Sequence, residues 1–277
     1  VRLKDYAAPA FQIDEVALDI ELNARRTLVH ATLAMRRNEA AAEKSGPLVL
    51  DGQGLTLIEV KIDGEVLGAN SYHADDQHLT IMQVPDGPFT LETLTTCNPQ
   101  ANTALTGLYL DSDIYCTQCE AEGFRRITYY LDRPDALSIF HTRIVADEKS
   151  VPVLLSNGNP VKRGKLKDGK HFVEWHDPFP KPAYLFALVA GDLAHVEDKF
   201  TTMSGREVTL RIFVEQGNEN LCSYAMDALK RAMKWDEERF GREYDLDIFM
   251  IVAVSAFNMG AMENKGLNVF NDKYILA

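Results

Sequence analysis

The stretch Val16-Ala17-Leu18-Asp19-Ile20-Glu21-Leu22 alternates apolar residues with small or charged ones. A period of two is that of a β-strand with one buried face. Similar runs recur between turn signals such as Asp63-Gly64 and Asp168-Gly169, where glycine accepts the positive φ of a tight turn. We therefore predict a mainly β fold that begins with an antiparallel sandwich or saddle of short strands. The other runs are 28–35, 55–62, 78–84, 89–96, 137–145 and 170–175.

A run rich in proline predicts the end of this first region. Asp177-Pro178-Phe179-Pro180-Lys181-Pro182 contains residues without an amide donor, so we expect it to interrupt the sheet. One last apolar strand at 184–190 follows, and Gly191 ends it. We expect a domain boundary near Asp192, with an N-terminal β domain at 1–192 and the incomplete beginning of a second domain at 193–277.

The spacing of apolar residues changes after this boundary. Residues 208–214 still alternate as in a strand, but residues 218–240 follow the period of a helix. Asn218 suits the N-cap and Gly241 the position just beyond the helix, so we expect the longest helix between them. Residues 248–254 are continuously apolar, which is typical of a strand covered on both faces. The apolar face of the predicted helix comprises Leu221, Ala225, Ala228, Ala232 and Trp235.

Composition and charge exclude several classes of protein. The 277 residues are 46% hydrophobic and 25% charged, which is typical of a folded globular chain. A formal net charge of -12 repels phosphate backbones and anionic lipid, so we expect no nucleic-acid partner. No apolar run approaches the roughly 18 residues of a membrane helix, and no signal peptide is recognisable at the start. Four cysteines are too few for a disulfide framework, which favours a reducing, cytoplasmic location.

Histidine and cysteine spacing predicts no metal site. A zinc-protease helix needs two histidines one turn apart with a glutamate beside the first, and none of the seven histidines fits. His171 and His176 are five apart, which places them on opposite faces of a strand. Cys116 and Cys119 have CxxC spacing but no second pair, so we expect packed, reduced thiols. Nucleophile elbows and phosphate-binding loops are also missing, and these patterns alone leave the function open.

Two further segments identify a family. Asn258-Met259-Gly260-Ala261-Met262-Glu263-Asn264 resembles the GAMEN exopeptidase motif of zinc aminopeptidases of the aminopeptidase N family. Thr117-Gln118-Cys119-Glu120-Ala121-Glu122-Gly123-Phe124-Arg125-Arg126 resembles the second substrate-binding segment of that family. The likeness is most specific over residues 107–277. It implies that the N-terminal β domain is followed by the first sheet and one long helix of a thermolysin-like α+β catalytic domain. The segments 127–134, 155–159, 186–192 and 234–241 also look like bacterial members.

The resemblance implies a substrate-binding site. An aminopeptidase must recognise a free α-ammonium, which needs fixed carboxylates, and must pair a strand edge with extended substrate. The family pattern assigns Glu263 and Glu120 to the amine. Met259 would cushion the first side chain of the substrate, because an unbranched thioether adapts to several shapes. The remaining implied substrate-binding residues are Gln118, Gly260, Ala261, Met262 and Asn264.

The family's zinc motif lies beyond Ala277, so we expect an N-terminal fragment without zinc ligands, general base or catalytic residue of its own. Zinc would be a cofactor of the complete protein, and the fragment alone would be inactive. The expected partners are peptides with a free N-terminus and the remaining C-terminal part of the parent chain. Two alternatives stay open: a non-catalytic module that binds peptide ends, and the leukotriene hydrolase branch of the family, which typically has glycine where Ala261 stands.

Overall fold

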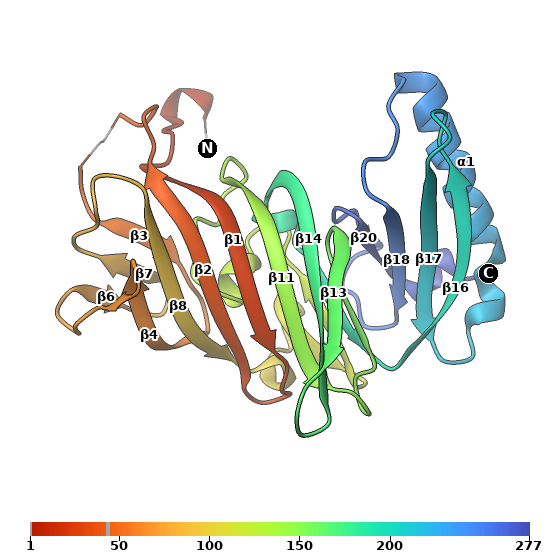
Figure 1. Cartoon of the computed structure of the whole chain (residues 1–277), viewed down its shortest axis with the longest axis horizontal. Helices are drawn as coiled ribbons and strands as arrows, with labels where there is room; N and C mark the ends of the chain where they lie inside the picture. Colours follow the sequence, from red (N-terminus) through yellow and green to blue (C-terminus); the bar gives the residue numbers. More distant parts are fainter. Residues whose placement is uncertain (1, 43–44) are drawn as a thin grey trace.

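A computed structural model describes residues 2–42 and 45–277. Figure 1 shows a series of β-sheets with one long helix at the end farthest from the eight-stranded sheet. The fold is mainly β, as the alternating runs predict. In spatial order, the eight-stranded sheet comprises β13 (Asn159–Lys165), β14 (Lys170–Pro182), β11 (Leu137–Asp147), β1 (Phe11–Glu21), β2 (Thr27–Arg37), β8 (Phe89–Cys97), β4 (Thr56–Ile62) and β5 (Glu65–Val66).

Alternation in β1 places one face of this sheet in the core. Val16, Leu18 and Ile20 are at most 2% exposed, whereas Ala17 between them is exposed. The prediction of antiparallel pairing is wrong at one position, because β1 and β11 run parallel. More than a hundred residues separate the two strands, and they include the whole three-stranded sheet and two strands of the four-stranded sheet. This connection is long enough to bring β11 back in the same direction as β1.

The proline-rich run does not interrupt the sheet, contrary to the prediction. Strand β14 continues to Pro182, with Lys181 paired to Ser138 of β11. Its other neighbour, β13, pairs with β14 only as far as His176, which lies opposite Asn159, the first residue of β13. Beyond that point β14 has a partner strand on one side alone, where proline can occupy positions whose amides need no partner. The predicted strand at 184–190 is shorter than expected, because Ala183–Leu185 form a 3-10 turn before β15 (Leu188–Gly191).

Two smaller sheets pack with the eight-stranded sheet in one large core. The four-stranded sheet carries the predicted substrate-binding segment at the end of β10, which pairs with β15 and β9. The strands of the four-stranded sheet are β12 (Val153–Ser156), β15, β10 (Ile114–Gln118) and β9 (Gly107–Asp111). Those of the three-stranded sheet are β3 (Leu48–Asp51), β7 (His78–Ile81) and β6 (Tyr72–Ala74). Besides Ala183–Leu185, the short 3-10 helices among the described residues are Leu3–Asp5, Pro99–Ala101, Phe124–Arg126 and Glu219–Leu221.

The last sheet has five strands and carries helix α1 (Ser223–Phe240) on one face. Strand β18 lies between two parallel neighbours and is buried on both faces, as its apolar run predicts. Met250 and Val252 join the large core shared with the N-terminal sheets, whereas Ile251 and Ala253 face the helix side. The strands are β16 (Leu193–Thr201), β17 (Glu207–Glu215), β18 (Ile248–Val254), β20 (Leu267–Asn271) and β19 (Ala261–Met262), and a short helix, α2 (Asp272–Ile275), follows.

Helix α1 is the longest described helix, but its start and its buried face differ from the prediction. A 3-10 turn precedes it, so Cys222 rather than Asn218 occupies the N-cap position. Gly241 ends the helix with φ 62°, a left-handed conformation that favours glycine. Trp235 is 57% exposed, contrary to the prediction. Larger apolar side chains set the buried face, because they remove more area from water than alanines do. This face comprises Ala225, Met226, Leu229, Met233 and Glu237.

None of the described helices has both the length and the apolar character needed to cross a membrane.

Candidate functional site

Two segments that are far apart in the sequence meet where the N-terminal sheets contact the five-stranded sheet. Gln118 is the last residue of β10, and its side chain is buried. Its Nε2 atom is in contact with Sδ of Met259, which lies 141 positions later in the segment after β18. The structure therefore brings together the two segments that the sequence analysis singled out.

Glu120 lies just beyond this contact, at the start of a loop. Its backbone N–H points to Oε1 of Gln118, at 3.4 Å, and its peptide bond to Ala121 is cis. The residue is exposed, and the described residues offer its carboxylate neither a hydrogen bond nor an ion pair. Glu120 is therefore an accessible acidic group that no cation of the described chain neutralises.

The GAMEN-like segment forms the edge strand of the five-stranded sheet. Ala261 pairs with Phe270 of β20, and β19 is the last strand in the order of the sheet. Gly260 and Ala261 are exposed, so the outer side of this edge is open to another extended chain. Glu263 follows the strand directly and is also exposed.

The two other residues predicted in this segment are buried. The side chain of Met262 joins the large core and is 0% exposed. Asn264 is 1% exposed. Its backbone carbonyl accepts hydrogen bonds from the Leu267 amide at 3.2 Å and from Nδ2 of Asn268 at 2.9 Å. These contacts shape the turn into β20. Within the described residues, therefore, Met262 and Asn264 support the segment and do not reach its open edge.

Contacts that the sequence analysis missed hold the segment in place. The Tyr109 hydroxyl donates to the carbonyl of Ala256 at 2.9 Å, and Nδ2 of Asn271 donates to the carbonyl of Phe257 at 3.1 Å. Burial raises the pKa of Tyr109, so this hydroxyl keeps its proton. Asn258 in turn donates to the carbonyl of Leu105 at 3.2 Å. No period or spacing could indicate these partners, because each bond joins a side chain to a backbone group distant in sequence.

The described residues do not fit a zinc ion. They contain no group of three or more His, Cys, Asp or Glu side chains placed to hold a metal. His171 Nε2 lies 2.8 Å from the carbonyl of Val151, whereas His176 stacks on His141 with ring centroids 4.2 Å apart. Cys116 and Cys119 are buried free thiols, and burial raises the pKa of Cys116 to about 11. The described histidine and cysteine side chains are therefore engaged in packing and hydrogen bonds and not gathered around a metal position.

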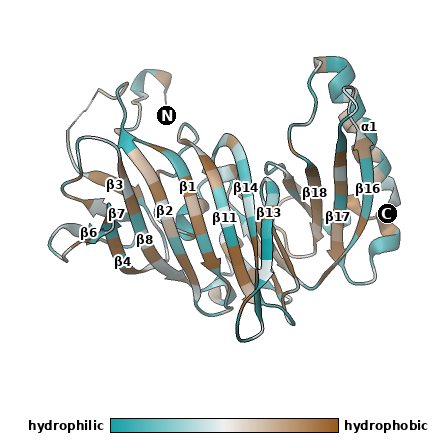
Figure 2. Ribbon diagram, viewed as in Figure 1, coloured by the Kyte–Doolittle hydropathy of each residue, from teal (hydrophilic) through white to brown (hydrophobic). Residues whose placement is uncertain are grey.

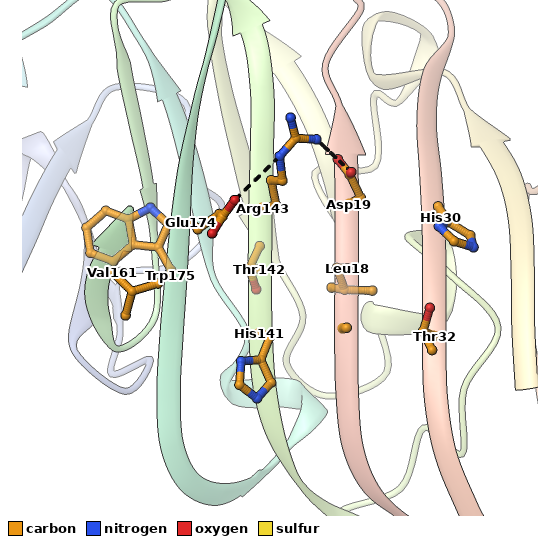
Figure 3. Close-up of a pocket in the computed structure, with 11 residues that line it drawn as sticks. Leu18, Asp19, His30, Thr32, His141, Thr142, Arg143, Val161, Glu174 and Trp175 are labelled. Carbon is orange, nitrogen blue, oxygen red and sulfur yellow. Dashed lines mark hydrogen bonds and ion pairs between the residues drawn. The ribbon is translucent and has the colours of Figure 1, made fainter. Parts of the chain in front are cut away.

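A separate cavity of about 300 Å³ lies on the polar face of the eight-stranded sheet, and Figure 3 shows the side chains around it. Arg143 is the one cation of the lining besides its histidines, and its guanidinium forms an ion pair of 2.6 Å with Asp19. The same guanidinium lies 3.8 Å from Glu174. Because its charge is already neutralised, the cavity offers no converging free charges, and it shares no residue with the two segments above.

Comparison with known proteins places both segments in one family. Residues 11–185 match the Peptidase M1 N-terminal domain, and residues 224–277 match the Peptidase family M1 domain. Aminopeptidase N of Caulobacter vibrioides is 57% identical over the whole chain, which covers 32% of that protein. Aminopeptidase N of Escherichia coli is 55% identical over 99% of the chain, which covers 31% of that protein. The chain thus spans about a third of the length of these relatives.

Solved structures agree with this assignment. Aminopeptidase A of Legionella pneumophila, in complex with aspartic acid, superposes with a TM-score of 0.95 at 36% identity, and the match covers all of this chain and 32% of that one. An M1 zinc metallopeptidase of Deinococcus radiodurans, bound to a Tyr-Ser-Ala substrate, gives a TM-score of 0.81 at 15% identity over 97% of this chain and 62% of that one, which supports the fold alone. The predicted resemblance is confirmed: the chain belongs to the M1 peptidase family.

Proposed function

We propose that the complete protein is a zinc-dependent aminopeptidase that releases N-terminal amino acids from peptides, and that this chain holds the substrate's free amine. The observation that carries the proposal is the contact between Gln118 and Met259. It places the segment with Glu120 beside the segment with Glu263. Relatives at 55–57% identity that bear the name aminopeptidase N give further support.

The chemistry of an ammonium ion explains why two carboxylates would share one site. Carboxylates brought close together repel, unless a cation lies between them. The α-ammonium of a peptide is such a cation, and its hydrogen bonds to ionised carboxylates are stronger than neutral ones. In this proposal Glu120 and Glu263 bind the ammonium, and Gln118 and Met259 form the floor between them.

The open edge of β19 accounts for the rest of the substrate. An extended peptide can add to a free strand edge through main-chain hydrogen bonds. Gly260 and Ala261 are exposed on this edge; the first has no side chain and the second only a methyl group, so a second backbone can approach closely. Met259 is 40% exposed, and its flexible side chain suits the first substrate residue of several sizes.

The remainder of the proposal concerns the catalytic machinery, the domain boundary and the location of the protein. We place the zinc ligands and the general base in the portion of the complete protein that this chain does not span. We keep the domain boundary near Asp192, between β15 and β16, and a cytoplasmic location as parts of this proposal. When bound, the zinc would activate water and polarise the scissile carbonyl. This chain's own residues bind the amine and orient the peptide.

The test is substitution of each carboxylate in the complete protein. Glu120→Gln and Glu263→Gln each remove one charge-assisted hydrogen bond, a loss of about 1.5–3 kcal/mol. We expect kcat/KM for peptides with a free N-terminus to fall about ten- to over a hundred-fold, with zinc content unchanged. Glu122→Gln is the matched control, because this exposed carboxylate lies two residues from Glu120 and should leave kcat/KM within about twofold.

Two outcomes would contradict the proposal. One is that both substitutions leave kcat/KM unchanged. The other is that N-acetylated peptides are cleaved as well as free ones, since acetylation removes the positive charge that the carboxylates recognise. A complete protein that binds peptides with a free N-terminus but cleaves none would instead indicate a non-catalytic module for peptide ends.

A further inference from the structure

The loop that carries Glu120 has few contacts of its own. Residues 119–123 connect the end of β10 to the 3-10 helix Phe124–Arg126. Within the loop, the Gly123 amide donates to the carbonyl of Cys119 at 2.8 Å. The Glu120 carboxylate has no partner among the described side chains. Its position therefore depends on how the two ends of the loop are held.

The last residue of the loop, Gly123, packs tightly against the end of β10. A Cβ atom added to Gly123 would lie 2.4 Å from the carbonyl oxygen of Gln118 and 2.8 Å from Cα of Cys119. Neither distance is compatible with a real side chain, so only glycine fits here without a shift of backbone. The loop is thus a closed turn whose last residue is packed against the backbone of its start. A displacement of the helix that follows it must move the backbone of Glu120.

Arg125 holds the second end through several atoms at once. Its Nε and its backbone N–H both donate to Oδ2 of Asp132, at 3.0 and 3.1 Å. Its Nη2 donates to the carbonyl of Asp132 at 3.1 Å. A guanidinium that binds one residue through two of its nitrogens fixes direction as well as distance.

We call the contacts between Arg125 and Asp132 the clamp. Asp51 connects the clamp to the three-stranded sheet. Nη1 of Arg125 lies 3.6 Å from Oδ1 of Asp51, and the other oxygen, Oδ2, accepts from the Asp132 amide at 3.1 Å. The backbone amide of Gln53 donates to the backbone carbonyl of Arg125 at 2.9 Å. The side chains of Asp132 and Arg125 are 2% and 17% exposed, so water weakens this network little. The further contact of Arg125 with Glu122, 3.8 Å at a side chain 70% exposed, adds little.

We infer that Arg125 and Asp132 are positioning residues for amine recognition: their buried ion pair fixes the loop that carries Glu120. The inference rests on the proposed function, because it assigns the clamp to the carboxylate that binds the substrate's ammonium. Neither residue touches the substrate. They act through the backbone of residues 119–123.

The experiment compares two inhibitors of the complete protein that differ in one amine. Alanine hydroxamate carries the α-ammonium, and propionohydroxamic acid is the same molecule without it. The variants are Arg125→Ala, Arg125→Lys and Asp132→Asn. Arg133→Ala is the matched control, because it removes an arginine–aspartate pair with Asp135 in the same stretch at the surface. Thermal unfolding of each variant is measured alongside, and Asp51→Asn replaces any variant that fails to fold.

We expect Arg125→Ala and Asp132→Asn to weaken inhibition by alanine hydroxamate about tenfold or more, and that by propionohydroxamic acid by less than about twofold. KM for free peptides should rise more than kcat falls. Arg125→Lys should be intermediate, because lysine keeps the charge without the planar fork. Arg133→Ala should change neither inhibitor. A structural role alone would lower the unfolding temperature without separating the two inhibitors.

Glu120→Gln is the reference that separates the two hypotheses. If it weakens alanine hydroxamate selectively and the clamp variants do not, the positioning inference is wrong and the proposed function stands. Equal weakening of both inhibitors by the clamp variants also overturns the inference. If Glu120→Gln itself fails to separate the inhibitors, the proposed amine site is wrong.

Discussion

The eight-stranded sheet and strand β18 bury apolar residues in different ways, and Figure 2 shows the contrast. In the sheet, hydrophobic and hydrophilic residues alternate along β1, so one face lies in the core and the other is polar. In β18, Met250 and Val252 contact the N-terminal core, while Ile251 contacts the core under α1. One strand thus takes part in both cores.

This difference shows how the two parts of the proposed site are held in fixed positions relative to each other. The GAMEN-like segment follows β18, and Gln118 ends a strand of the N-terminal sheets. Because β18 packs against those sheets with one face, the segment after it is fixed relative to Gln118. A strand with one polar, solvent-facing side can pack against only one of the two cores.

The largest effect that tests the comparison is a buried charge in β18. Val252→Asp places a carboxylate at a residue that is 0% exposed. Burying an unpaired charge costs several kcal/mol, and losses above about 4 kcal/mol are exceptional, so we expect most of the folded population to be lost. Circular dichroism and urea unfolding would measure this loss.

The matched control is the same change on the outermost strand of the eight-stranded sheet. Val161 on β13 is 61% exposed, so Val161→Asp should alter the free energy of unfolding by no more than about 0.5 kcal/mol. Similar losses from the two aspartates would show that the two regions do not differ in the way described.

A smaller effect concerns the buried ion pair of β14. Nζ of Lys181 lies 3.1 Å from Oδ2 of Asp177, and their side chains are 4% and 0% exposed. Burial lowers the pKa of Lys181 to about 8, and the charge of Asp177 opposes this shift without cancelling it. Between pH 8 and the ordinary value of 10.5, the folded chain therefore binds fewer protons than the unfolded chain. Stability should rise with pH over this window.

Urea unfolding between pH 7.5 and 10.5 would measure that rise. The double variant Lys181→Met with Asp177→Asn removes both charges, so its stability should lack this contribution. Breaking the pair with Lys181→Met alone should cost about 3–5 kcal/mol, because the Asp177 charge stays buried. Parallel pH profiles for the natural chain and the double variant would refute the assignment.

The smallest effect lies on the polar face of the eight-stranded sheet. His141 stacks on His176, with ring centroids 4.2 Å apart. Burial, and then the charge of His176, lower the pKa of His141 below its ordinary value of 6.5. The unfolded chain therefore takes up the proton first as pH falls. The stabilising contribution is complete above pH 6.5 and is lost as pH falls from that value through the lower pKa of the folded chain.

Thermal unfolding at pH 8 and at pH 5 would reveal this contribution. His176→Gln removes the neighbouring charge, so the loss of stability between the two pH values should be smaller in that variant. An equal or larger loss in His176→Gln would mean that the charge of His176 does not contribute to lowering the pKa of His141.

The sequence by itself determined the elements and the family. Alternation in Val16–Leu22 and the unbroken apolar run at 248–254 reflect backbone geometry, which repeats every two residues in a strand wherever the strand lies. Gly241 marked the end of α1 because few other residues adopt a left-handed backbone. The two motif segments were recognisable because their residues are contiguous.

Only the tertiary structure decided which elements meet. Residues distant in sequence meet in the parallel pairing of β1 with β11 and in the contact of Gln118 with Met259. The buried face of α1 is likewise set by the sheet that it packs on. The same holds for the clamp between Arg125 and Asp132. A local pattern shows which side of an element is apolar. It cannot show what covers that side, because the partner is selected by packing and hydrogen bonding over the whole chain.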